Sequence, residues 1–156
     1  MTSDLPGGRT EYPPVPPVRY DEVEVGTQIP PRSYQLRRLS LVKYAGASGD
    51  FNVIHWNERV AREVGLPNVI SHGMLTMAQA GNFVTEWANG DPGAVVELGV
   101  RFSKMVPVPD DDEGATVEIR GTVAGKLGDG KVEVDLTARS GDEKVLSRSH
   151  AVVRLP

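Results

Sequence analysis

The residues best suited to chemistry in this chain are a carboxylate and an imidazole five positions apart, Asp50 and His55. They lie in an apolar run punctuated by glycine, residues 44–55. Such a pair can hold a water molecule and move protons. In a continuous helix, five residues would rotate the second side chain by roughly 140° from the first. The two side chains therefore converge only if the chain leaves the helix between them, and Gly49 supplies the place.

Two short helices are expected to flank this pair. Ser40 is a good N-cap residue for a helix over residues 41–47, which would deliver Asp50. Beyond His55, Asn57 is predicted to cap a helix over residues 58–64. Gly65 follows at the position where glycine commonly ends a helix.

A longer helix is predicted over residues 71–88, where small or apolar residues occupy nearly every face. A helix of this kind should be wrapped by other structure. The stretch is shorter than a typical membrane span and contains Asn82 and Glu86, so a buried core helix is expected and no membrane span.

Alternating apolar and polar residues predict half-buried antiparallel strands in the second half of the chain. The strands are expected over residues 116–123, 132–138 and 144–155, with a turn at 126–130 and an earlier short strand around 33–38. One buried helix followed by a meander predicts an α+β fold in which the sheet curls around that helix.

Length and composition exclude several classes of protein. The 156 residues fit one domain over residues 19–156, preceded by an extended proline-rich arm over residues 1–18 that packs on its own domain or on a neighbour. A net charge of −4 argues against broad binding to nucleic acid or anionic membranes. The absence of cysteine excludes disulfides and thiolate chemistry. We find no signal-peptide pattern, and a cytoplasmic location is expected.

Two segments together resemble the MaoC-like family of R-specific enoyl-thioester hydratases and 3-hydroxyacyl-thioester dehydratases. They are residues 44–56 and the sequence Ser71-His72-Gly73-Met74-Leu75. The resemblance continues through residues 93–95, 100–102 and 106–109 and covers about residues 20–155. Within the family, the chain looks most like the catalytic B subunit of the dehydratase that elongates mycolic-acid precursors in type II fatty acid synthesis. One departure is Val53, where many relatives have proline. The resemblance implies a hot-dog fold, an antiparallel sheet wrapped around a long central helix.

The same resemblance implies a role for each candidate residue. His55 would accept the C2 proton of a 3-hydroxyacyl thioester, and Asp50 would orient the hydroxyl group and help to move its proton. The backbone N–H of Gly73, near the start of the long helix, would form the oxyanion hole. Asn52 and Ser71 would support the site by fixing the loop and capping the helix. No metal-ligand spacing is present, and no metal or cofactor is expected.

The remaining candidates have ordinary structural interpretations. His72 is expected to pack or to bond to the backbone, and His150 to lie in a strand at a surface or interface. An apolar set is expected in the core, with some members bordering an acyl tunnel: Met74, Leu75, Met77 and Phe83. Four cations could meet carrier-protein acids or coenzyme A phosphates, although solvated charges explain them equally well: Arg37, Arg38, Arg101 and Lys104.

These observations predict an (R)-3-hydroxyacyl-thioester dehydratase, or trans-2-enoyl-thioester hydratase, acting on acyl carrier protein (ACP) in type II fatty acid elongation. One alternative is a homodimeric R-specific enoyl-CoA hydratase of fatty-acid degradation or polyester supply. Others are a non-catalytic acyl-binding subunit of a dehydratase complex and a hot-dog thioesterase. The expected partners are an acyl thioester and a second hot-dog subunit, identical or different.

Overall fold

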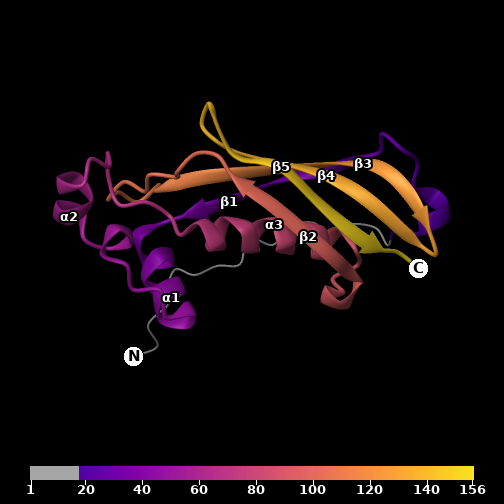
Figure 1. Cartoon of the computed structure of the whole chain (residues 1–156), viewed down its shortest axis with the longest axis horizontal. Coiled ribbons are helices and arrows are strands. Elements are labelled where there is room, and N and C mark those ends of the chain that lie inside the picture. The colour runs from indigo at the N-terminus through magenta and orange to yellow at the C-terminus, as the bar shows by residue number, and fades with distance from the viewer. Residues whose placement is uncertain (1–17) are drawn as a thin grey trace.

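The computed structural model describes residues 18–156, which form an antiparallel sheet packed along one long helix (Figure 1). In chain order the elements are η1 (Tyr20–Glu22), β1 (Gln28–Leu36), α1 (Arg38–Ser48), η2 (Val53–His55), α2 (Glu58–Glu63), α3 (Gly73–Trp87), η3 (Pro92–Ala94), β2 (Val95–Phe102), β3 (Ala115–Gly128), β4 (Lys131–Ser140) and β5 (Glu143–Arg154). The η elements are single turns of 3₁₀ helix.

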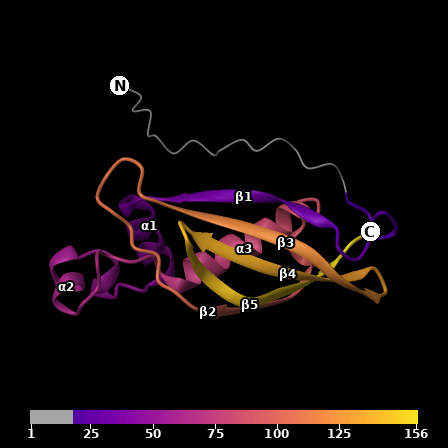
Figure 2. The ribbon, with the colours of Figure 1, turned by 90° about the horizontal axis from the view of Figure 1, so that it is seen from above.

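The five strands lie in the order β1-β3-β4-β5-β2, and every neighbouring pair is antiparallel (Figure 2). After α3 and η3 the chain enters β2, which pairs with the last strand, β5, at the edge of the sheet opposite β1. β1 and β2 therefore form the two edges of the sheet. Inward-facing residues of β3 and β4 alternate with exposed ones and pack against the buried face of α3. The predicted meander and the α+β class are confirmed.

The first strand is longer than the sequence indicated. β1 begins at Gln28 and passes through Pro30 and Pro31, and its register with β3 shifts between Ile29 and Arg32. Proline cannot donate to a ladder hydrogen bond, but an edge strand with a bulge tolerates it. The predicted strand, residues 33–38, therefore covered only the regular second half of β1 and ran past its end.

The first helix also begins earlier than expected, because Ser40 is not its N-cap. Arg37 holds the N-cap position, and Ser40 lies at the third helical position, where its hydroxyl accepts a hydrogen bond from the Arg37 N–H at 3.2 Å. The Asn57 cap of α2 is confirmed, since its side chain accepts from the Val60 N–H.

The sheet covers only one side of α3. Thr76, Phe83 and Val84 are buried beneath it, whereas Met74, at 55% exposure, faces solvent. A single curved layer of five strands cannot enclose a helix on all sides. The expected all-round burial is wrong for the isolated chain, and Met74 is not a core residue.

The expected proline-rich arm, residues 1–18, lies outside the described residues except for Val18. The backbone N–H of Val18 donates to the Asn89 side chain at 2.8 Å, and Asn89 donates in return to the Val18 carbonyl. No helix among residues 18–156 is long and apolar enough to cross a membrane.

Arg38 ties the start of α1 to two distant segments. Its guanidinium donates to the Val108 carbonyl at 2.7 Å, to Glu58 at 2.8 Å and to Asn68. These contacts hold α1 and α2 against the segment that follows β2. Arg38 is therefore one of the anchors of the site-bearing loop between the two helices, beside the hydrogen bond from the Ile70 N–H to the Ile54 carbonyl.

We expect Arg38→Ala to lower the midpoint of thermal unfolding by about 5 °C, because it leaves part-buried acceptors without a donor. Thermal melts followed by circular dichroism measure the change. The matched control is Arg59→Ala, which removes an exposed i,i+4 pair with Glu63 and should shift the midpoint by about 1 °C or less. Equal shifts for the two variants would contradict the assignment of Arg38 as an anchor.

Candidate active site

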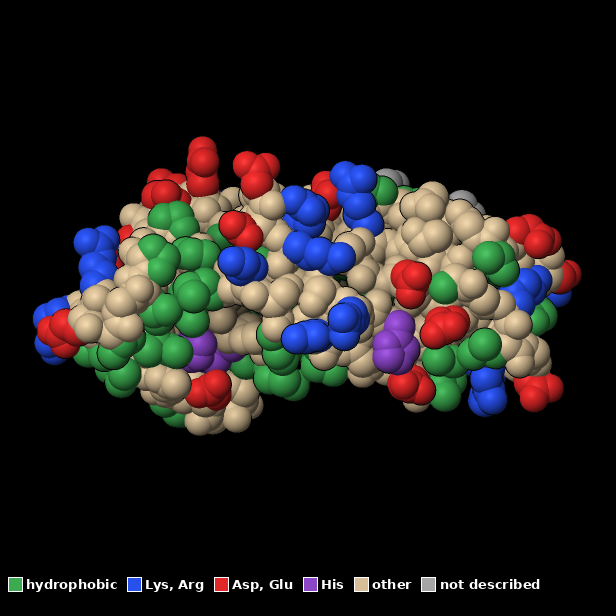
Figure 3. Space-filling model, turned by 45° about the horizontal axis from the view of Figure 1, so that its top comes forward, with side chains coloured by type: hydrophobic (Ala, Val, Ile, Leu, Met, Phe, Trp, Pro, Cys, Tyr) green, Lys and Arg blue, Asp and Glu red, His purple; other side chains and the backbone are tan. Residues whose placement is uncertain are grey.

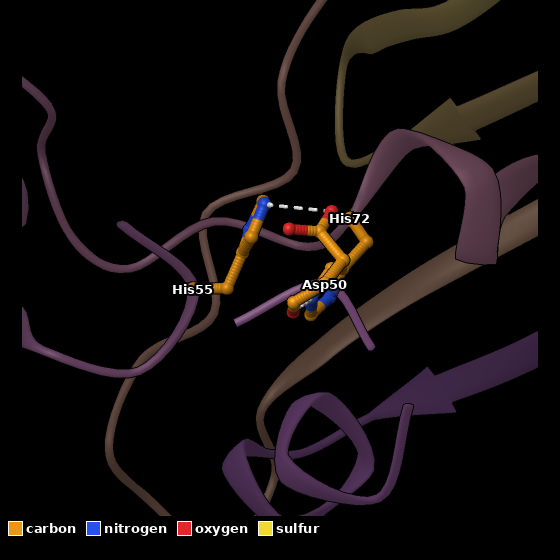
Figure 4. A group of neighbouring side chains, drawn as sticks. All are labelled: Asp50, His55 and His72. Carbon is orange, nitrogen blue, oxygen red and sulfur yellow. Dashed lines mark hydrogen bonds and ion pairs between the residues drawn. The ribbon is translucent and has the colours of Figure 1, made fainter. Parts of the chain in front are cut away.

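The turn at Gly49 brings Asp50 and His55 together. Gly49 ends α1 in the left-handed region, with φ of 77°, and its N–H donates to the Ala45 carbonyl at 2.9 Å. The chain then runs through a short loop into η2, which ends at His55. The Nε2 atom of His55 lies 4.0 Å from Oδ2 of Asp50 (Figure 4). The chain leaves the helix where the sequence indicated, and the two side chains converge.

Local hydrogen bonds shape the loop that carries Asp50. Oδ1 of Asp50 accepts from the Asn52 N–H at 3.2 Å, and the Asn52 side chain accepts from the Ile54 N–H at 3.3 Å. The Trp56 indole donates to the Phe51 carbonyl at 3.0 Å. Because Oδ1 is engaged in the turn, Oδ2 is the oxygen left to face His55. The Asn52 side chain thus caps η2.

His55 is held in one tautomer. Its Nδ1 atom lies 2.7 Å from the Ile70 carbonyl, and since a carbonyl only accepts, Nδ1 carries the proton. In the neutral ring Nε2 then has a free lone pair, directed toward Asp50. The ring is buried, whereas the Asp50 side chain is about half exposed, at 52%. A buried imidazole with an unprotonated Nε2 beside a carboxylate can take and return a proton.

The long helix begins beside this pair. Gly73 is the first residue of α3, a position at which the backbone N–H has no intrahelical partner. The preceding residues are held in place because the Ser71 N–H donates to the Val106 carbonyl at 2.8 Å. Ser71 is not the N-cap: His72 is, and the Ser71 hydroxyl bonds to the His72 carbonyl instead.

A pocket of about 350 Å³ opens at the start of α3. His55, Ser71 and Gly73 lie on its wall, whereas Asp50 and Asn52 are not among its lining residues. The other lining residues come from α3, the segment before it, the end of β2 with the residues after it, and β5: Ile70, Thr76, Phe102, Ser103, Lys104, Met105, Val106, Val145 and Leu146. His55 and Gly73 thus border a mainly apolar pocket, which suits an acyl chain.

Nothing in the sequence pattern predicts that several of these residues line a pocket. Phe102 ends an edge strand, and its ring lies over Gly73, 3.2 Å from the place a Cβ atom would occupy there. Val145 and Leu146 read as ordinary strand residues, yet both face the pocket. Periodicity assigns such residues to a face of the sheet, but it does not say that a cavity lies beneath that face.

His72 lies directly behind the pair, and Asp50, His55 and His72 place ligand atoms within 4.8 Å of one another. A metal bound by imidazole lies in the plane of the ring, along the nitrogen lone pair. The two imidazoles are stacked, with centroids 3.7 Å apart and planes at 23°. Their lone pairs run in nearly parallel planes and do not meet at one point. The arrangement suits proton transfer better than a shared metal ion.

The MaoC like domain family matches residues 22–140. The chain belongs to this family. A solved MaoC-like dehydratase is 39% identical, with a TM-score of 0.84 over 88% of this chain and 42% of that one. The R-hydratase PhaJ1 from Pseudomonas aeruginosa, at 23% identity and a TM-score of 0.75 over 90% of this chain and 86% of that one, shares the fold. The predicted hot-dog fold of this MaoC-like domain is confirmed.

Two curated relatives share part of the MaoC-like sequence. The 3-hydroxyacyl-thioester dehydratase X of Mycobacterium tuberculosis is 35% identical over 85 residues, 53% of this chain and 29% of that protein. The fatty acid synthase beta subunit TOXC of Cochliobolus carbonum is 30% identical over 104 residues, 66% of this chain and 5% of that protein. The chain therefore spans less than a third of the length of these relatives.

Proposed function

We propose that this MaoC-like chain is a hydro-lyase that interconverts (R)-3-hydroxyacyl and trans-2-enoyl thioesters. The observation that carries the proposal is the placement of the His55 ring at the wall of an apolar pocket, with Nδ1 2.7 Å from the Ile70 carbonyl and Nε2 4.0 Å from Asp50. General acid–base chemistry needs such a positioned, unprotonated nitrogen. The names of the relatives, a 3-hydroxyacyl-thioester dehydratase and an R-hydratase, agree with this chemistry.

In the dehydration direction, Nε2 of His55 removes the C2 proton and the electrons of that C–H bond form the C2–C3 double bond. The C3–O bond breaks, and the hydroxyl group, held by Asp50, leaves as water after the imidazolium returns a proton. Hydration runs the same steps backward. No outside oxidant, reductant or cofactor is needed, because the products are the enoyl thioester and one water molecule.

Negative charge develops on the thioester oxygen as the C2 proton leaves, and Gly73 is the proposed donor to it. The N–H of Gly73 lies at the N-terminus of α3, where the helix dipole also favours negative charge. Glycine allows the carbonyl to approach the backbone closely.

We expect Gly73→Ala to lower kcat/KM by roughly 10–100-fold, because the new methyl group would press on the Phe102 ring and crowd the approach of the carbonyl. The matched control on the same helix is Gly81→Ala, whose methyl group would make an ordinary 3.4 Å contact with Leu98. Steady-state kinetics of both variants test this. If both lose activity equally, helix packing and not the oxyanion site is responsible.

We further propose ACP as the carrier and type II fatty acid elongation, at the mycolic-acid precursor stage, as the setting. Lys and Arg side chains gather over the outer face of the sheet (Figure 3). Lys104 lines the pocket, and Arg101 is exposed on the adjoining strand β2. Within residues 18–156 neither has an ion-pair partner, so both are available to an acidic surface. Arg38 is not available to such a surface, because its guanidinium donates to the Val108 carbonyl and to Glu58.

A second hot-dog subunit is the proposed partner. Large apolar side chains are exposed on α3, at the pocket and on the loop that carries Asp50 and His55: Met74, Phe102, Met105, Phe51 and Trp56. An apolar patch of this kind beside a binding site marks a protein interface. One structure of similar fold is the ChsH1-ChsH2 complex from Mycobacterium tuberculosis, 19% identical with a TM-score of 0.73.

The test uses the purified full chain with trans-2-enoyl thioesters of increasing chain length on ACP and on coenzyme A, following loss of the conjugated enoyl absorbance. Light scattering gives the mass of the assembly. Faster turnover on ACP supports elongation, and faster turnover on coenzyme A favours a degradative enoyl-CoA hydratase. Release of free thiol would indicate a thioesterase. No turnover on either carrier, with a second hot-dog subunit supplied, would overturn the proposed activity in favour of a non-catalytic acyl-binding subunit.

A further inference from the structure

His72 is the most buried ionisable group of the site, at 1% exposure, and the proposed chemistry makes no use of it. Its Nε2 atom lies 3.1 Å from the backbone carbonyl of Asp50. Its ring stacks on His55, and the Tyr44 ring lies against it at a centroid distance of 4.9 Å. His72 thus contacts both members of the pair, at the backbone of one and the ring face of the other (Figure 4).

The hydrogen bond defines the tautomer of His72. Because the Asp50 carbonyl can only accept, Nε2 carries the proton, and Nδ1 has a lone pair when the ring is neutral. This Nδ1 atom is buried and has no hydrogen-bond partner among the described residues. A proton on Nδ1 would place a buried donor without a partner, and a charge, against a second imidazole.

The ionisable groups that face His72 are His55 from η2, Asp50 from the loop and Tyr44 from α1. Burial lowers the pKa of His72, and the hydrogen bond to the Asp50 carbonyl opposes it in part. The charge on His55, which lowers the pKa, and the Asp50 carboxylate, which raises it, have smaller effects. At neutral pH the ring is therefore neutral.

We propose that His72 is a positioning residue of the hydratase site that fixes the Asp50 backbone through Nε2–H and supports the face of His55 as that ring gains and loses its proton. This inference rests on the proposed function. Asp50 follows a left-handed glycine and is half exposed, so its own loop provides little packing against displacement. The bond from His72 reaches it from the start of a different element, α3, and couples the loop to the helix that carries Gly73.

Two substitutions separate the hydrogen bond from the stacked ring. His72→Phe keeps a planar ring against His55 but removes the donor to Asp50. His72→Gln places an amide nitrogen close to the position of Nε2 and keeps the donor without the ring. A small displacement of a catalytic group can cost up to about 10²-fold in rate. We expect His72→Phe to lower kcat by roughly 10–100-fold with KM changed less than about threefold, and His72→Gln to restore most of kcat.

The matched control is His150→Phe, which removes a half-buried imidazole bonded to Glu97 on β2, outside the pocket. It should keep wild-type kcat. Thermal melts of every variant separate loss of folding from loss of positioning. Rescue by Gln is the decisive comparison, because a purely packing role would be preserved better by Phe than by Gln.

A second measurement does not depend on activity. The chain has only three histidines, so their ring nitrogens can be followed individually by NMR across a pH titration. We expect His72 to show the Nε2–H tautomer and to be neutral at pH 7, because burial lowers its pKa. Activity in the wild type with full kcat in His72→Phe would overturn the positioning role, as would a His72 that is protonated at pH 7. Absence of hydratase activity in the wild type would defeat the proposed function alone, and the titration would still decide the state of His72.

Discussion

Replacement of His55 by asparagine is expected to lower kcat by about 10³-fold or more while the fold stays intact. Asparagine can place an amide N–H near the position of Nδ1 and so preserve the 2.7 Å bond to the Ile70 carbonyl. It has no lone pair at the position of Nε2, so the C2 proton has no acceptor. The loss should lie in kcat more than in KM, because the substituted atom meets the substrate at the reacting carbon and not along the acyl chain.

Enoyl-thioester hydration by His55→Asn, compared with His150→Asn, measures this effect. His150 lies in β5 and is bonded to Glu97, so the control should retain turnover within about twofold. Circular dichroism and thermal melts verify the fold of both variants. Turnover of His55→Asn within tenfold of wild type would remove His55 from its role as the base.

Replacement of Asp50 by asparagine is expected to lower kcat by roughly 10²–10³-fold. The amide oxygen can still accept from the Asn52 N–H, so the loop keeps its shape. The charge that faces His55 is lost, and with it the stabilisation of the imidazolium formed when the C2 proton arrives. The hydroxyl group also loses the acceptor that holds it in place for departure.

Asp129→Asn is the matched control for this change. Asp129 lies in the β3–β4 turn with φ of 52°, a conformation that asparagine tolerates well. The double variant His55→Asn with Asp50→Asn should lose little more than the worse single variant, because groups that act as one unit are not additive. A multiplicative loss would mean that the two residues act independently.

Much of the neighbourhood of the site could be predicted from local sequence. Gly49 ends α1 in the left-handed conformation, and the Asn57 side chain caps α2. Both effects operate over a few residues, through backbone conformation and a side-chain hydrogen bond. For this reason the loop that presents Asp50 and His55 is visible in the sequence before any tertiary contact is known.

The boundaries of helices and strands were harder to predict from the sequence where tertiary pairing competes with local conformational preference. Pro30 and Pro31 argue against a strand, yet β1 continues through them, because it lies at an edge and gains pairing with β3 on its other side. Ser40 has the character of an N-cap, but α1 begins at Arg38, whose guanidinium is bonded to the Val108 carbonyl. That contact joins residues 70 positions apart in the sequence.

The sequence by itself determined the α+β class, through the periodicity of its apolar residues. It also determined the turn that joins Asp50 to His55 and the glycine at the start of the long helix, since these follow from residue types within a few positions. Only the tertiary structure decided which tautomer His55 holds, that His72 supports both members of the pair, and that Phe102 and Leu146 line the pocket. The physical reason is that a carbonyl partner, a stacked ring and a cavity wall are supplied by segments distant in sequence, and neither periodicity nor propensity records which segments will meet.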